Sequence, residues 1–339
     1  MKKALVNFLK IAVPLGIGVW LVFKTYNDLS DAQKNELFAA FRLADMRWLV
    51  LATVVGWLAH VSRGWRWRYL LSPLGHRPGF WSCYHAVMIG YFMNMFIQRA
   101  GEASRAVSLY RSEKVPFEQG FGTILAERVV DTAMLAGIGV ITVLFQLDKL
   151  ELFQARIAQY RASQGPTGGG GFPWFTVILL ALGVALVVGI YLVFTRPALR
   201  ARVMDLLRGF GQGLRAVLST QEKGAFILHT LFIWGAYLAM FKVGFYCLPT
   251  MVDVPFAGIL AGFIMGAVGI VLVQGGIGVY PALVALTVGM YMPASSGGEL
   301  LRPDALAMGW LLWLAQTLMI IVLGGLSLLL TALQKPAAS

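Results

Sequence analysis

Two short charged motifs contain the residues whose types and spacing could do chemistry. The motifs read R-x-x-E-x-x-R and E-R-x-x-D, and their charged members are Arg99, Glu102, Arg105, Glu127, Arg128 and Asp131. Both lie inside or against segments that are otherwise apolar. An ionisable group within a membrane costs roughly 2.5–3.5 kcal/mol, so such groups are kept for a purpose. Because arginine binds phosphate through paired N–H groups, the motifs predict a site for an anionic group.

The carboxylates of these motifs have two interpretations that remain open. Residue spacings of three and four place Glu127, Arg128 and Asp131 near one face of a helix. From that face they could handle a substrate or a proton, or they could pair with the arginines as a structural network. Glu102 precedes Arg105 by three residues, which predicts an ion pair between these two side chains.

The composition requires a membrane environment for the elements that position these residues. Hydrophobic residues make up 58% of the 339 residues and charged residues 13%, and the mean hydropathy is +0.72. We attribute the net charge of +12 to loops facing the cytoplasm and anionic lipids, not to nucleic acid. Cys83 and Cys247 lie in apolar runs and are predicted to be packing residues.

Apolar runs of about 17–25 residues predict six full membrane spans. These spans are residues 4–23, 48–62, 120–147, 174–194, 225–248 and 305–333. The loop 24–47 has no positive excess and is predicted outside, whereas a cytoplasmic loop is predicted to hold Arg63, Arg66, Arg68 and Arg77. A second basic stretch, 195–224, predicts an amphipathic helix on the inner leaflet or a solvated loop. We therefore expect a multi-pass protein of the bacterial inner membrane, with both termini in the cytoplasm.

Two further segments are predicted to turn within the membrane. Residues 80–97 are apolar, but after a turn at 98–102 the segment 103–110 has only 8 residues. At about 1.5 Å per residue it cannot cross a core of roughly 30 Å, which predicts a re-entrant helical hairpin. Residues 254–273 and 279–292, joined by a glycine-rich turn at 274–278, form either a second hairpin or two full spans.

The order of these elements predicts an all-α polytopic integral membrane protein with an inverted-topology repeat. Residues 1–147 form the first half, 174–335 the second half and 148–173 an external linker, within a single transmembrane domain. Broken helices at corresponding positions of inverted halves indicate a transport site near the midplane. The candidate substrate-binding residues at the two turns are Asn94, Gln98, Gln274, Gly275, Gly276 and Tyr280, in addition to the six charged residues.

Four segments of the sequence resemble the lysylphosphatidylglycerol synthase transmembrane-region family, also called flippase-like proteins. These segments are GYFMN (90–94), RAGEASRA (99–106), GTILAERVVD (122–131) and GGIGVYPA (275–282). The resemblance implies a polytopic protein that moves lipids between leaflets, without the soluble aminoacyl-transferase domain of some members. The chain departs from the family pattern in having Gln98 and Gln274 where proline is common.

We therefore expect a transporter of a phosphate-bearing lipid that uses no cofactor and is not an enzyme. The alternatives are a membrane-embedded enzyme of lipid or polyprenyl-phosphate metabolism and a non-catalytic assembly role. His60, His85 and His229 lack the spacing of metal ligands, so no metal site is predicted. The expected partners are membrane lipids. A homodimer is also possible, because four small residues could pack either internally or against a second copy: Gly183, Gly189, Gly324 and Gly325.

Overall fold

The computed structural model describes residues 2–97, 100–149, 151–155, 158, 195–197, 201, 204, 220, 222–293 and 301–333. Within these ranges the chain is helical and contains no strands. The helices are α1 (Lys2–Asp28), α2 (Asp31–Leu43), α3 (Met46–Leu71), α4 (Phe80–Phe96), α5 (Ala100–Glu113), α6 (Phe117–Leu144), α11 (Lys223–Phe245), α12 (Phe256–Leu272), α13 (Val279–Gly289) and α14 (Pro303–Leu333).

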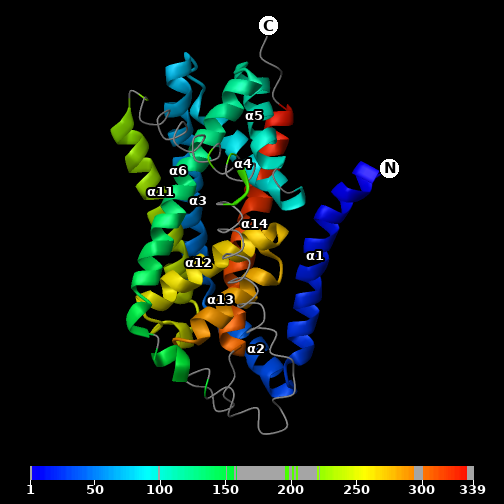
Figure 1. Ribbon diagram of the computed structural model, residues 1–339, viewed down its shortest axis with the longest axis vertical. Coiled ribbons are helices and arrows are strands. Elements are labelled where there is room, and N and C mark those ends of the chain that lie inside the picture. Colours follow the sequence, from blue (N-terminus) through cyan, green and yellow to red (C-terminus); the bar gives the residue numbers. More distant parts are fainter. Residues whose placement is uncertain are drawn as a thin grey trace.

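Besides α1, which lies at one side, the long helices α3, α6, α11 and α14 run along the long axis of the molecule (Figure 1). The stretches Phe117–Lys149, Lys223–Phe245 and Pro303–Leu333 are long and apolar enough to cross a membrane. They coincide with predicted spans 120–147, 225–248 and 305–333, so the chain is a multi-pass membrane protein. Predicted span 174–194 and the predicted amphipathic helix lie outside the described residues, as does most of the linker 148–173.

Two pairs of shorter helices pack between the long ones, α4 with α5 and α12 with α13. In Figure 1 the first pair lies in the upper part of the molecule and the second in the lower part. The turns of the two pairs touch, because the Gln274 side-chain amide donates a 3.0 Å hydrogen bond to the Met95 carbonyl. Trp313 of α14 holds the second turn by donating a 2.6 Å hydrogen bond to the Gly275 carbonyl.

The second turn requires glycine for both its backbone conformation and its packing. Gly275, Gly276 and Gly278 have φ values of +67°, +71° and +71°, which residues with a Cβ rarely adopt. A Cβ on Gly278 would also lie 2.5 Å from the Gly18 carbonyl oxygen. Helix α1 therefore crosses this turn through a close backbone contact between two glycines.

The glycines of α12 pack inside the protein, as their four-residue spacing predicts. A Cβ on Gly258, Gly262 or Gly266 would meet Tyr291, Val288 or Tyr280 at 2.9, 3.0 and 2.7 Å. Gly324 likewise packs internally, with Phe92 Cβ 2.6 Å from the position of an added Cβ. Cys83 and Cys247 are buried and unpaired, which confirms that they are packing residues.

Two predictions about the first 70 residues are wrong. The predicted loop 24–47 contains α2, which begins with a capping box in which Ser30 and Gln33 exchange hydrogen bonds of 2.6 and 3.3 Å. Helix α3 does not end at residue 62 but continues to Leu71, so Arg63 and Arg66 are buried helix residues and not part of a loop.

Candidate functional site

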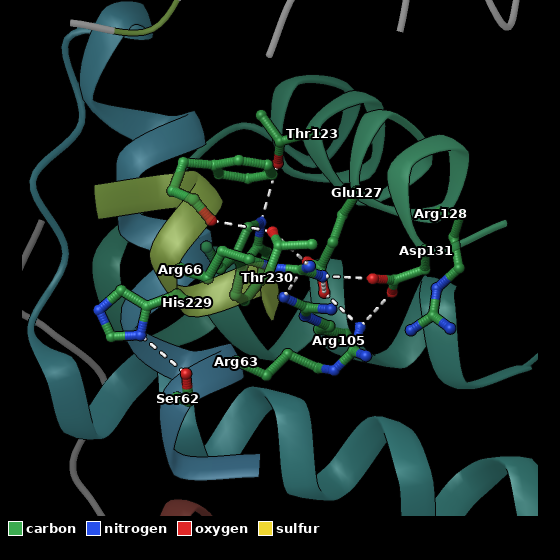
Figure 2. Close-up of polar contacts among 12 residues, drawn as sticks. Ser62, Arg63, Arg66, Arg105, Thr123, Glu127, Arg128, Asp131, His229 and Thr230 are labelled. Atoms are coloured by element: carbon green, nitrogen blue, oxygen red, sulfur yellow. Dashed lines mark hydrogen bonds and ion pairs between the residues drawn. The ribbon is translucent and has the colours of Figure 1, made fainter. Parts of the chain in front are cut away.

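Three helices bring charged side chains together at one buried position. Arg63 and Arg66 lie three residues apart on α3, and Glu127 and Asp131 lie four residues apart on α6, so each pair shares one helix face. Arg105 reaches the same position from α5. We call Arg63, Arg66, Arg105, Glu127 and Asp131 the arginine cluster; Figure 2 shows these side chains pointing toward one another.

Each member of the arginine cluster has at least one oppositely charged partner within hydrogen-bonding distance. Arg63 Nη1 donates to Glu127 Oε1 at 2.6 Å and to Asp131 Oδ2 at 2.5 Å. Arg66 Nη2 donates to Glu127 Oε1 at 2.9 Å and to Asp131 Oδ1 at 2.8 Å. Arg105 Nη2 donates to Glu127 Oε2 at 2.7 Å. Glu127 is fully buried. Its two carboxylate oxygens bridge all three arginines.

The residues around the arginine cluster hold the guanidinium groups in place. Arg105 lies over the Trp67 ring at 3.9 Å, and Trp67 is fixed by a 2.9 Å hydrogen bond from Nε1 to Thr123 Oγ1. Arg66 also donates a 3.0 Å hydrogen bond to Thr230 on α11. The cluster thus ties α3, α5, α6 and α11 together.

The charge of the arginine cluster is not balanced. Three guanidinium groups face two carboxylates, all of them nearly free of solvent contact. The Nε atoms of Arg63, Arg66 and Arg105 are buried without a hydrogen-bond partner. Since buried charge is costly unless it is paired, this surplus favours an additional anion nearby.

Arg128 and Glu102 form a second, looser pair beside the arginine cluster. In Figure 2 Arg128 lies beside Asp131, and no dashed line joins it to the arginine cluster. Its Nε lies 3.9 Å from Glu102 Oε1. The two side chains are 40% and 22% exposed, and Arg128 Nε and Glu102 Oε2 make no hydrogen bond. The predicted ion pair between Glu102 and Arg105 is wrong, because Arg105 points toward α6 and Glu102 faces Arg128.

The remaining predicted site residues lie at the two turns. Asn94 Oδ1 accepts a 2.7 Å hydrogen bond from the Gly101 backbone N–H and so braces the first turn. Gln98 and Arg99 lie outside the described residues. Gln274, Gly275 and Gly276 form the second turn. Tyr280, which is buried, follows it, and its hydroxyl accepts a 3.1 Å hydrogen bond from Gln316.

Arg63 and Arg66 are the site residues that the sequence analysis missed. A run of aromatic and basic residues, RGWRWRY at 63–69, looks like the end of a span where the chain meets the cytoplasm. The available signal was the three-residue spacing of the two arginines, which matches the spacing of charged residues on one helix face.

Comparisons with known proteins agree with this architecture. A family model described as the lysylphosphatidylglycerol synthase transmembrane region matches residues 8–301. A UPF0104 membrane protein of Methanocaldococcus jannaschii is 32% identical over 90 residues, 26% of this chain and 27% of that protein. The glycosyltransferase AglD of Haloferax volcanii is 32% identical over 111 residues, 32% of this chain and 18% of that protein.

These matches with curated relatives span less than a third of either relative's length. No solved structure matches the chain. The family model, in contrast, covers most of the sequence and includes every residue of the arginine cluster. The chain therefore belongs to the lysylphosphatidylglycerol synthase transmembrane-region family.

Proposed function

We propose that this protein moves a phosphate-bearing lipid between the two leaflets of its membrane. The observation that carries the proposal is the surplus of arginine at a buried position, next to an arginine that is not held by a close ion pair. A lipid phosphate would supply the missing negative charge and accept paired N–H groups. The family match adds support, since its description names a phospholipid.

The geometry supports different roles for the arginines. Arg63, Arg66 and Arg105 are each held by a carboxylate at 2.5–2.9 Å and form the framework. Arg128 is 40% exposed and lies 3.9 Å from the Glu102 carboxylate, so its guanidinium N–H groups can donate hydrogen bonds to a ligand. In the proposed cycle the lipid phosphate binds Arg128 and replaces Glu102 as its partner.

The two helix pairs fit an inverted-repeat transporter. We propose that α4–α5 and α12–α13 are re-entrant hairpins, one in each of two inverted halves (1–147 and 174–335). Their positions in upper and lower parts of the molecule (Figure 1) and the hydrogen bond from Gln274 to Met95 support this arrangement. Rocking of the halves about the touching turns would expose the headgroup to either leaflet while the acyl chains stay in lipid.

A transport assay with a matched arginine control tests this function. Purified protein is placed in liposomes with acyl-labelled phosphatidylglycerol, and transfer is followed with a membrane-impermeant quencher. Arg128→Ala should slow transfer about tenfold or more, because a hydrogen bond to a charged group contributes roughly 1.5–3 kcal/mol. Arg77→Ala removes an exposed arginine from the loop before α4 and should leave the rate unchanged.

Two other outcomes would contradict the proposal. Equal transfer by wild type and Arg128→Ala would exclude Arg128 from the lipid path. Chemical change of the lipid, detected by mass spectrometry of extracted lipids, would instead favour a membrane-embedded enzyme, the alternative suggested by the glycosyltransferase name of one relative. We expect the lipids to be recovered unchanged.

A further inference from the structure

Four aromatic side chains gather on the Arg63 side of the arginine cluster. His60 comes from α3, Tyr91 from α4, and Trp234 and Tyr237 from α11. The His60 ring lies 4.4 Å from the Tyr91 ring and 5.9 Å from the Tyr237 ring. The rings of Trp234 and Tyr237 are 6.1 Å apart. We call these four residues the aromatic group.

Two polar atoms of the aromatic group have no hydrogen-bond partner in the protein. His60 is only 4% exposed, and its Nδ1 atom has no hydrogen-bond partner. The indole Nε1 of Trp234 is also buried without a partner. The hydroxyls of Tyr91 and Tyr237 share one hydrogen bond of 3.3 Å, which is longer than usual for O–H···O. A ring cluster that served only for packing would gain stability from phenylalanine at these positions, since unpaired buried polar atoms cost about 1–3 kcal/mol each.

The aromatic group adjoins the positively charged end of the site. His60 and Arg63 are three residues apart on α3, and the Arg63 guanidinium lies 5.9 Å from the centre of the Tyr91 ring. Aromatic rings can also bind ammonium groups, but here Arg63 already occupies that role at Tyr91. A second cation beside the surplus of arginine would be repelled. The chemistry therefore favours a neutral, hydrogen-bonding ligand group next to an anionic one.

We propose that His60, Tyr91, Trp234 and Tyr237 form a hydroxyl-binding subsite that selects phospholipids with hydroxyl groups on the headgroup beyond the phosphate. The lipid phosphate lies toward Arg128. The headgroup hydroxyls bond to the unpartnered His60 Nδ1 and Trp234 Nε1 and to the hydroxyls of Tyr91 and Tyr237, which they take from their long mutual hydrogen bond. This inference rests on the proposed lipid transport and names the headgroup class for it.

Variants that keep the rings and remove the polar atoms test the subsite. The probes are acyl-labelled phosphatidylglycerol, whose headgroup carries two hydroxyls, and phosphatidic acid, which has the phosphate alone. Wild-type protein should move phosphatidylglycerol faster. Trp234→Phe and Tyr237→Phe should each lower that preference about 2- to 10-fold, the effect of losing one neutral hydrogen bond. Phosphatidic acid should be transferred at an unchanged rate.

Trp310→Phe is the matched control. Trp310 lies on α14, where its ring is 5.5 Å from the Trp313 ring and it lines a pocket with Val22 of α1 and Leu37 of α2. None of these helices contributes to the aromatic group, so the replacement of Trp310 should leave the lipid preference intact. Thermal unfolding of each purified variant shows whether the fold is retained. If wild type has no preference for phosphatidylglycerol, or if both variants keep it, the hydroxyl-binding subsite is refuted.

A binding measurement separates this inference from the proposed function. Native mass spectrometry of the detergent-purified protein compares retention of phosphatidylglycerol and phosphatidic acid by wild type and Trp234→Phe. Preferential retention that the variant loses, without transfer in liposomes, would support the subsite and overturn the transport proposal. Equal retention of both lipids by wild type would overturn the subsite whatever the transfer assay shows.

Discussion

Replacing Glu127 by glutamine should destabilise the protein far more than the same replacement at Glu102. Glu127 is fully buried and accepts hydrogen bonds from Arg63, Arg66 and Arg105 at 2.6, 2.9 and 2.7 Å. The neutral amide would leave Arg63 and Arg66 with the single carboxylate of Asp131 and Arg105 with no carboxylate partner. Removing one partner of a buried ion pair costs about 3–5 kcal/mol, because the other charge is left uncompensated.

Glu102→Gln makes the same chemical change where little should be lost. The Glu102 carboxylate is 3.9 Å from Arg128, and the two side chains are 22% and 40% exposed. Such a pair contributes about 0–1 kcal/mol. The two variants should therefore differ by at least about 2 kcal/mol, a factor of roughly 30 in the unfolding equilibrium.

The assay is a titration of the purified protein in mixed micelles with a denaturing detergent, followed by the loss of helical circular dichroism. We expect the unfolding midpoint of Glu127→Gln to fall well below that of wild type, with reduced yield in the membrane fraction. Glu102→Gln should unfold close to wild type. Similar midpoints for the two variants would refute the reasoning, because they would mean that Glu127 does not hold the three arginines together.

Two further predictions concern the touching turns. Gly278→Ala should lower the unfolding midpoint, since its Cβ would lie 2.5 Å from the Gly18 carbonyl and the backbone has a φ of +71°. Gly16→Ala is the control, because the added Cβ meets open space there. Equal midpoints for the two variants would contradict the close contact between Gly18 and Gly278. Gln274→Leu removes the 3.0 Å hydrogen bond to the Met95 carbonyl and should speed amide hydrogen exchange in both turns, measured by mass spectrometry; unchanged exchange would show that the bond does not hold the turns together.

The positions of most helices could be predicted because apolar length is a local property. The predicted span 305–333 matches α14 (Pro303–Leu333) to within two residues, and the predicted break after residue 97 lies between α4 and α5. Helix α2 was missed although Ser30 and Gln33 are spaced as a capping box. Its short, mixed sequence does not resemble a membrane span, so a search for long apolar runs overlooks it.

The charged site could be predicted only in part, because ion pairing is not local. A prediction from hydropathy ends the span at Arg63 and Arg66, since an unpaired arginine is unfavourable in a membrane. Their carboxylate partners are 61–68 residues away in the sequence. Only the packing of α3 against α6 shows that these arginines belong with Glu127 and Asp131. The same packing directs Arg105 to Glu127 and leaves Glu102 to Arg128.

The separation of these partners along the chain has a consequence for biogenesis. The ribosome completes α3 before Glu127 and Asp131 exist, so Arg63 and Arg66 would enter the bilayer without partners. Each unpaired arginine costs roughly 2.5–3.5 kcal/mol at the centre of a helix. We therefore expect nascent α3 to remain beside the insertion machinery until α6 has been made. The first half of the protein is then released into the lipid as one unit, only after residue 131 has been translated.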